Sequence, residues 1–573
     1  MPSKHIDTLD KEQIAAVEAS ENAIGVLAGP GSGKTRVLAN RTRHLLLTHD
    51  GSQALLLTFT NKAAAEMKSR ALSIGGLDAN RIHATTFHGF GATFLRSHGN
   101  LVGIDPDFEI VDAEEAEEIA RKTASALGIG NQFRRWSNHR LRNFEIPDNL
   151  KGFGDAYEAA KRAEGVVDFD DLVYYTAKVF DERQEVAETY GGLYPHILVD
   201  EFQDTNPAHF SIVSSLASHA ATVSVFADDD QAIMRFAGAD AANVQRFLDE
   251  LSAKTYPLTC NYRCREAIVS KANLLIAADP GCSGRQMRPD KSGGVVDLHR
   301  FSNTVQEAQE VAANIAGRVF DQGQLPSSIA VLVRNGPRAA EIVSALLERG
   351  VPVTDWRGVA YESAERRMLI TCLSALRPKL HSRQASRLAE FMGVELVDER
   401  DTHAFIELQA GNAVADELLI LRSEAFEDTA PSQLAERAQA AIAAHDADAG
   451  ERARTLVEAV ADFESFDPNF SLDQLMAELA LRSGGRPPTQ GGGVKVATLH
   501  GTKGLQWATV FLVGLEEGKL PDFRAEEEET IPDERRACFV GVCRAEDELL
   551  LTYSQYYRTF YQAPSRFLNE MEM

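Results

Sequence analysis

The chain has 573 residues, 44% of them hydrophobic and 25% charged, which is typical of a soluble protein of about three to five domains. It contains no run of about 18 apolar residues, and its polar N-terminus lacks an apolar signal core, so we expect no membrane partner and a cytoplasmic location. The six cysteines show no zinc-type pairing, and the net charge of -25 is unusual for a nucleic-acid-binding protein. A local groove could still bind phosphates, so charge alone excludes no such partner.

The first motif with chemical content is LAGPGSGKTRVL, which follows an apolar segment that we predict to be a buried strand. The strict phosphate-loop pattern is Gly, four residues, then Gly-Lys-Ser/Thr, and this chain has alanine in the first position, where a small residue suffices. The pattern predicts a nucleotide site formed by Ala28, Gly29, Pro30, Gly31, Ser32, Gly33, Lys34 and Thr35. The alternative is a glycine-rich turn without a ligand.

Each residue type in this loop has a physical role. Gly31 and Gly33 supply the backbone freedom that lets N–H groups surround phosphates, and the helix that begins near Lys34 adds its positive end. Lys34 would reach the β- and γ-phosphates, and Thr35 would bind Mg²⁺. The loop therefore predicts ATP and Mg²⁺ as cofactors.

A second motif, HILVDEFQDTN, places two acids after a short apolar segment, Ile197–Val199. Asp200 would hold the metal with its water shell, and Glu201 would polarise the attacking water. Two adjacent acids could instead be a charge pair at a helix N-terminus. The phosphate loop favours the catalytic interpretation.

Short apolar strands alternate with helical segments over most of the chain, which predicts an α/β fold with parallel sheets. We predict buried strands at Ala23–Leu27, Ala54–Phe59, Ile197–Val199, Val223–Phe226, Val295–Leu298, Ile329–Val333, Val494–Ala497 and Val510–Val513. Two long helical stretches lie between the sets of strands. The predicted organisation is a first core at 1–88 and 193–258 with a helical insertion at 89–192, and a second core at 259–377 and 485–573 with a helical insertion at 378–484.

The motifs, taken in order, resemble those of the UvrD/Rep-like DNA helicases of superfamily 1, which move 3′ to 5′ on single-stranded DNA. The resemblance covers nearly the whole chain and rests on LDKEQIAAV, AGPGSGKT, LLLTFTNKAAAEM, ATTFHGF, DFDDL, LVDEFQDTN, FADDDQAIMRFAGA, LTCNYRCREAI, ATLHGTKGLQW, FLVGLEEGKLP, CRAEDELLLTYS and APSRFL. It implies two RecA-like P-loop cores with parallel sheets, each interrupted by a mainly helical insertion.

The resemblance also implies roles at the nucleotide. Gln13 would read the adenine, and Arg36 and Tyr262 would sandwich its ring. Gln231 would sense the γ-phosphate. Arg263 and Arg544 would be arginine fingers from the second core, although a lone arginine is more often part of a surface ion pair.

For the DNA strand, the resemblance implies contacts from Phe59, Asn61, Thr86, His88, Phe236 and His500. Aromatic faces would stack on bases, and small polar groups would bind phosphates. Phe59 and Phe236 could equally be core residues. A basic stretch with one tryptophan, Arg134, Arg135, Trp136, Arg140 and Arg142, could meet duplex DNA or form a solvated helix face.

Three features depart from the family pattern. Met234, Phe236 and Ala237 stand where an aromatic residue, a tryptophan and an arginine are usual. Gln506 replaces a glutamate that accepts from the ribose hydroxyl. The insertion at 378–484 is shorter than in typical members, where it forms a domain that grips duplex DNA.

The resemblance implies an ATP-dependent 3′–5′ DNA helicase or translocase in DNA repair or replication restart. Its partners would be single-stranded DNA, tailed or forked duplex DNA, and a repair or replication protein. One alternative is a translocase that displaces proteins or needs a partner to unwind. Another is a nucleotide-gated DNA-binding switch. The pattern does not exclude RNA.

Overall fold

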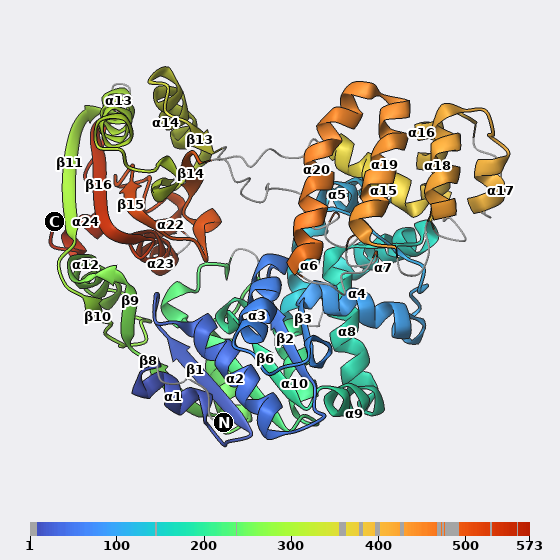
Figure 1. Cartoon of the computed structure of the whole chain (residues 1–573), viewed down its shortest axis with the longest axis horizontal. Helices are drawn as coiled ribbons and strands as arrows, with labels where there is room; N and C mark the ends of the chain where they lie inside the picture. Colours follow the sequence, from blue (N-terminus) through green and yellow to red (C-terminus); the bar gives the residue numbers. More distant parts are fainter. Residues whose placement is uncertain are drawn as a thin grey trace.

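A computed structural model describes residues 9–143, 146–235, 238–354, 363–376, 382–395, 402–424, 429–466, 472, 475, 479, 492–527, 530–557 and 560–573. Of the helices in these ranges, none is long and apolar enough to cross a membrane. Figure 1 shows the chain as two sheet-containing cores and two groups of helices.

The first core is a six-stranded, wholly parallel sheet in the order β3-β2-β6-β7-β1-β8. Its strands are β1 (Ala23–Ala28), β2 (Ala54–Thr58), β3 (Ile82–Thr86), β6 (His196–Val199), β7 (Thr222–Ala227) and β8 (Lys254–Leu258). Its helices are α1 (Lys11–Val17), α2 (Lys34–Thr48), α3 (Asn61–Ser73), α4 (Phe87–His98), α9 (Gln184–Leu193), α10 (Pro207–Ala217) and α11 (Ala242–Glu250). Both faces of this sheet are apolar. Successive strand residues point to opposite sides, so Leu55 and Leu57 enter one core cluster, and Ala54 and Leu56 enter the other.

The first insertion leaves this sheet after α4 and returns before β6. It contains α5 (Ala113–Ala126), α6 (Phe133–Asn143), α7 (Asp148–Glu164), α8 (Phe169–Glu182) and a two-stranded pair, β4 (Glu109–Ile110) with β5 (Val166–Val167). Asp168 begins α8 with a capping box, which fixes where that helix starts. A separate apolar cluster around Trp136, Phe153 and Tyr157 holds α5, α6 and α7 together.

The second core is a seven-stranded sheet in the order β11-β16-β15-β12-β14-β13, with β17 antiparallel to β16. Its strands are β11 (Val295–Asn303), β12 (Ile329–Val333), β13 (Val353–Thr354), β14 (Val494–Thr498), β15 (Trp507–Leu512), β16 (Ala545–Tyr557) and β17 (Phe560–Tyr561), with the pair β9 (Cys260–Arg265) and β10 (Arg288–Lys291) beside it. Its helices are α12 (Glu266–Ala277), α13 (Thr304–Ala316), α14 (Gly336–Glu348), α22 (Arg524–Glu527), α23 (Ile531–Val542) and α24 (Arg566–Glu570).

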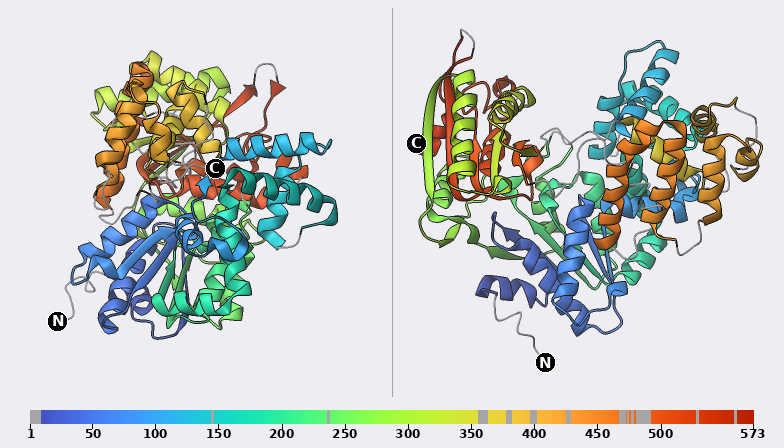
Figure 2. Two further views of the ribbon diagram at one scale, coloured as in Figure 1. Left: turned by 90° about the vertical axis from the view of Figure 1, so that its right-hand side faces the viewer. Right: turned by 45° about the horizontal axis from the view of Figure 1, so that its top comes forward.

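The second insertion consists, in the part that the structure describes, of α15 (Ser363–Ser374), α16 (Ser382–Met392), α17 (Thr402–Glu407), α18 (Ala413–Glu424), α19 (Pro431–His445) and α20 (Ala447–Phe466). These helices share one apolar cluster of their own, so the insertion has its own core. In Figure 1 and in the right-hand view of Figure 2, the second core and the two helical insertions stand on opposite sides of the first core.

The predicted fold class is confirmed: two parallel-sheet cores are each interrupted by a helical insertion. The first sheet takes its strands from both sides of the predicted first insertion, and the second sheet does so around the second. The predicted strands are present with small shifts in their ends. β11 runs five residues beyond the expected Val295–Leu298 because its polar second half still pairs with β16, a pairing that apolar patterning does not reveal.

Candidate nucleotide and nucleic-acid sites

The phosphate loop lies between the end of β1 at Ala28 and the start of α2 at Lys34. Gly33 is the N-cap of α2 in the left-handed region, with φ 80°, and makes no side-chain cap hydrogen bond. The first N–H groups of α2 therefore point into the loop without a side-chain acceptor at the cap. Such a helix start attracts anions, because unpaired N–H groups and the helix dipole act together.

Glycine is required at two loop positions. Gly31 and Gly33 both have positive φ, 69° and 80°. A Cβ at position 31 would lie 2.7 Å from Cβ of Arg263, and one at position 33 would lie 2.8 Å from Nε2 of Gln13. Both close approaches involve residues that the sequence predicts at the nucleotide.

Three hydrogen bonds from residues outside the phosphate loop hold its carbonyl groups in place. Gln13 donates from Nε2 to the carbonyl of Ser32 at 2.9 Å, and Asn261 donates from Nδ2 to the carbonyl of Pro30 at 2.8 Å. The backbone N–H of Tyr262 donates to the carbonyl of Gly31 at 2.9 Å. Strand β9 of the second core therefore contacts the loop directly, and Tyr262 is fixed by a hydrogen bond from its hydroxyl to Asp10.

Lys34 pairs with both predicted acids. Its Nζ lies 2.6 Å from Oε1 of Glu201 and 3.6 Å from Oδ1 of Asp200. Burial alone would lower the pKa of Lys34, but the two carboxylates raise it above its ordinary value. Burial alone would raise the pKa of Glu201, yet Lys34 and Lys503 hold it well below its usual range. The carboxylate of Glu201 is thus kept charged.

Glu201 also has an unusual backbone, with φ 52° in the left-handed region. A non-glycine residue there carries local strain, which is often found at functional sites. The side chain accepts from Nε2 of Gln203 at 2.5 Å. The turn therefore points Glu201 back toward Lys34 at the loop.

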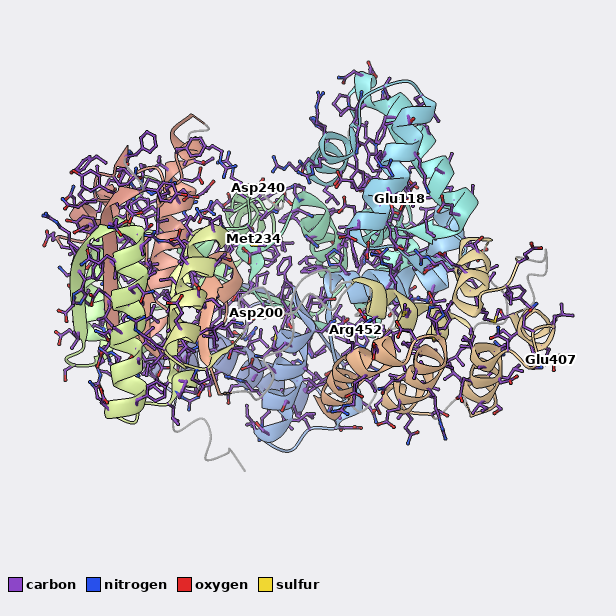
Figure 3. All side chains as sticks on the ribbon, turned by 90° about the horizontal axis from the view of Figure 1, so that it is seen from above. Glu118, Asp200, Met234, Asp240, Glu407 and Arg452 are labelled. Atoms are coloured by element: carbon purple, nitrogen blue, oxygen red, sulfur yellow. The ribbon has the colours of Figure 1, made fainter. Side chains whose placement is uncertain are left out.

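Sequence reasoning missed Lys503 and Asp204. Lys503, in the TKG segment of the second core, lies 3.4 Å from Oε2 of Glu201 and also pairs with Asp204 of the first core. Both residues stand inside motifs quoted above, but only the folded chain shows that they meet. Figure 3 places Asp200 at the centre of the molecule, where the two cores adjoin.

Gln231 joins the two cores. Its Oε1 accepts from Nη2 of Arg544 at 2.8 Å, and its Nε2 donates to the carboxylate of Asp228. Arg544 also donates to the carbonyls of Val540 and Leu505, each at 3.0 Å. Burial and the neighbouring Arg263 lower the pKa of Arg544 to about 10, so it remains a cation at neutral pH.

Arg263 has a different partner. Its Nη1 donates to the carbonyl of Cys543 at 3.2 Å, and the thiol of Cys264 lies 3.6 Å from the same oxygen. The two predicted arginine fingers are thereby held at neighbouring places in the second core. Arg36 and Gln506 are exposed, which leaves both accessible from solvent.

The predicted DNA contacts fall into two groups. Phe59 packs against Phe87 and His209, with ring centroids 5.5 and 5.4 Å apart, so it is partly a core residue. Thr86 caps α4 by accepting from the N–H of Gly89 at 2.9 Å. His88 is held neutral because burial lowers its pKa to about 4. Asn61 is the first residue of α3, on the same core.

His500, in contrast, lies on the second core after β14, where burial and Arg334 lower its pKa. Phe236 and Ala237 lie outside the described residues. Met234 packs against an apolar cluster of the second core and stands between that core and the first insertion in Figure 3.

The basic stretch on α6 requires a correction. Trp136 and Arg140 are 1% exposed, so neither belongs to a solvated face nor is open to duplex DNA. Arg140 pairs with Asp171 at 2.7 Å and Glu158 at 3.0 Å, and Trp136 packs against Tyr157. Arg134, Arg135 and Arg142 are exposed. One face of α6 is therefore buried and the other is exposed. The sequence alone does not reveal which of its arginines lies on the buried face.

Two parallel-sheet cores around a phosphate loop define a P-loop protein with two RecA-like cores. The sequence profile of the UvrD/REP helicase N-terminal domain matches residues 9–252, and that of the UvrD-like helicase C-terminal domain matches 256–392 and 399–556. The chain therefore belongs to the UvrD/REP helicase family, and the predicted resemblance is confirmed.

Among its relatives are the DNA helicases II of Salmonella typhimurium strain LT2 and Escherichia coli strain K12, each 29% identical over 99% of this chain and 88% of the relative. The ATP-dependent DNA helicase PcrA of Bacillus subtilis strain 168 is 28% identical over 98% of this chain and 85% of the relative. These alignments span 633, 633 and 638 positions, more than the 573 residues of this chain. The relatives therefore carry residues that this chain lacks.

Proposed function

We propose that this protein is an ATP-dependent 3′–5′ DNA helicase or translocase that moves along single-stranded DNA. The observation that carries the proposal is the hydrogen bond between Gln231 of the first core and Arg544 of the second, beside the Lys34–Glu201 pair. Groups for hydrolysis come from both cores. Hydrolysis then depends on how the cores are aligned, and alignment by a bound strand is the basis of a motor.

In the proposed reaction, the loop amides and the start of α2 bind the phosphates of ATP, and Lys34 moves from Glu201 to the β- and γ-phosphates. Glu201, released from Lys34, accepts hydrogen bonds from the attacking water and polarises it. Arg263 and Arg544 neutralise charge that develops on the transferred phosphoryl group. Such an arginine contributes on the order of 10³–10⁵ in rate.

The residues predicted for Mg²⁺ suit that ion. Oδ1 of Asp200 is buried and makes no hydrogen bond within the described ranges, and Thr35 brings a hydroxyl to the first turn of α2. Hard oxygen ligands of this kind are those that Mg²⁺ prefers. When bound, the ion would neutralise charge on the β- and γ-phosphate oxygens.

For the strand, we propose contacts from Phe59, Asn61, Thr86 and His88 on the first core and from His500 on the second. Closing and reopening the cores around ATP would alternate the grip between these two groups, which converts hydrolysis into directional movement. The 3′–5′ direction, and a role in repair or replication restart with a protein partner, are proposed from the resemblance to the family.

The test compares unwinding of matched 3′-tailed and 5′-tailed duplexes with ATP and Mg²⁺, together with ATP turnover with and without single-stranded DNA. We expect turnover to be low alone and to rise strongly with the strand, and we expect movement only from the 3′ tail. Preference for the 5′ tail would refute the direction. Slow turnover that DNA does not stimulate would favour the nucleotide-gated switch.

A further inference from the structure

A loop of the second core, between α12 and β10, lies against the segment of the first core that carries Gln231. Ser283 donates from its backbone N–H and its hydroxyl to the carboxylate of Asp230, at 3.0 and 2.6 Å. Nη2 of Arg285 lies 3.5 Å from Oδ1 of Asp228 and 4.0 Å from Oδ2 of Asp230. This loop is a further contact between the cores, separate from those of Arg544, Lys503 and β9.

Asp228 occupies a fully buried position at the start of this segment. Its backbone N–H donates to Oε1 of Gln203 at 3.0 Å, and its Oδ2 accepts from Nε2 of Gln231. Its other oxygen, Oδ1, makes no hydrogen bond in the part of the chain that the structure describes. The guanidinium of Arg285 is the cation placed beside that oxygen.

We propose that Arg285 is a positioning residue for ATP hydrolysis, which holds the Asp228 carboxylate and through it fixes the side-chain amide of Gln231. The inference rests on the proposed function, because it assumes that Gln231 senses the γ-phosphate. Two arginines of the second core then act on the same glutamine: Arg544 binds its Oε1 directly, and Arg285 acts on its Nε2 end through Asp228.

The two ends of the Gln231 amide are chemically different, since its oxygen accepts hydrogen bonds and its nitrogen donates them. Its partners therefore determine which way round the amide is held. A carboxylate only accepts hydrogen bonds, so Asp228 selects the Nε2 end of Gln231 and leaves Oε1 for Arg544. Nε2 carries a second N–H, which remains available for a phosphate oxygen. When the cores separate, both arginines withdraw together and the amide loses its orientation.

Removing Arg285 would leave a buried carboxylate without its cation, which is strongly unfavourable. Burial raises the pKa of Asp228, and the charge of Arg285 opposes that rise. Without the arginine, the carboxyl would take up a proton. A protonated carboxyl can donate to Oε1 of Gln231, so the amide would turn over and lose its bond to Arg544.

The experiment measures ATP turnover of the full chain at saturating single-stranded DNA. We expect Arg285→Ala to lower kcat by about one to two orders of magnitude with little change in KM for ATP, and Arg285→Lys to recover much of the loss. Asp228→Asn removes the charge that Arg285 balances. The double variant should therefore be no slower than the slower single variant. Arg288→Ala, which removes an arginine that is 70% exposed at the end of the same loop, is the matched control.

Wild-type turnover in Arg285→Ala, or additive losses in the double variant, would overturn the inference while DNA-stimulated turnover of the wild type leaves the proposed function standing. If the wild type shows no DNA-stimulated turnover, both fall. Unfolding midpoints equal to that of the wild type separate positioning from misfolding. Should Arg285→Ala not fold, Arg285→Gln is judged by the same criteria.

Discussion

Lys34 and Glu201 form an ion pair, and this pairing predicts how their variants differ. Glu201→Gln removes the carboxylate that polarises water and also releases Lys34 and Lys503 from a negative partner. We expect this variant to bind ATP at least as tightly as the wild type but to hydrolyse it about 10²–10⁴ times more slowly. Lys34→Ala should lose turnover with the fold intact. Equilibrium binding of a fluorescent ATP analogue and single-turnover hydrolysis measure the two effects, and normal turnover in Glu201→Gln would rule out the proposed general base.

The two arginines predict losses in rate rather than in binding. Arg544→Ala and Arg263→Ala should each lower kcat by on the order of 10³–10⁵ with little change in nucleotide affinity, if they act on transition-state charge. Arg544→Lys should not restore the rate, because one ammonium cannot reach the carbonyls of Val540 and Leu505 and Gln231 at once in the planar geometry of a guanidinium. Steady-state kinetics with single-stranded DNA decides the matter. Loss of ATP binding alone in both alanine variants would contradict the assignment.

At the scale of single elements, α6 carries one buried arginine, Arg140, and three exposed ones, of which Arg134 is a direct comparison. Arg140→Met removes one of the two cations, the other being Lys161, that pair with the buried Asp171 and the partly buried Glu158. We therefore expect a loss of at most about 3–5 kcal/mol in the stability of the first insertion. Arg134→Met, at a side chain that is 85% exposed, should change it by less than about 0.5 kcal/mol.

Urea unfolding followed by Trp136 fluorescence, in a background where Trp356 and Trp507 are phenylalanine, reports on that insertion alone. Equal effects of the two substitutions would show that the Arg140 cluster adds nothing to stability.

Strands and motifs were predictable from the sequence because they depend on neighbours in the chain. Apolar runs located the strands, and the glycine, lysine and paired-acid spacing located Lys34 and Glu201. The burial of Arg140 was not predictable, because it depends on acids in α7 and α8 that only packing brings to α6. Lys503 and Arg285 were missed for the same reason, because each lies beside a carboxylate of the other core that is distant in the sequence.

Across the whole molecule, the two insertions are joined to each other. Arg387 of the second insertion donates to the buried Glu109 of the first at 2.8 Å and also pairs with Glu115. The helices of the second insertion therefore stand beside the first insertion and apart from the second core, as Figure 1 and the right-hand view of Figure 2 show. We propose that these helices hold the duplex ahead of the cores.

In the proposed motor, the departures at Met234 and Ala237 and the second insertion, which we predict to be short, would weaken the link between ATP use and strand separation. The groups proposed for phosphate chemistry are all present in the sequence. Met234 packs partly against the second core and offers no flat face, so a base placed against it would lack the stacking energy of about 1–3 kcal/mol that an aromatic face contributes. We therefore expect robust DNA-stimulated hydrolysis and 3′–5′ translocation but poor unwinding of long duplexes by a lone monomer. Met234→Tyr combined with Ala237→Arg should raise the base pairs opened per ATP more than ATP turnover. Unwinding under single-turnover conditions, with a trap that captures released protein, measures this. Efficient opening of a long duplex by the unmodified monomer would show that the departures do not limit coupling.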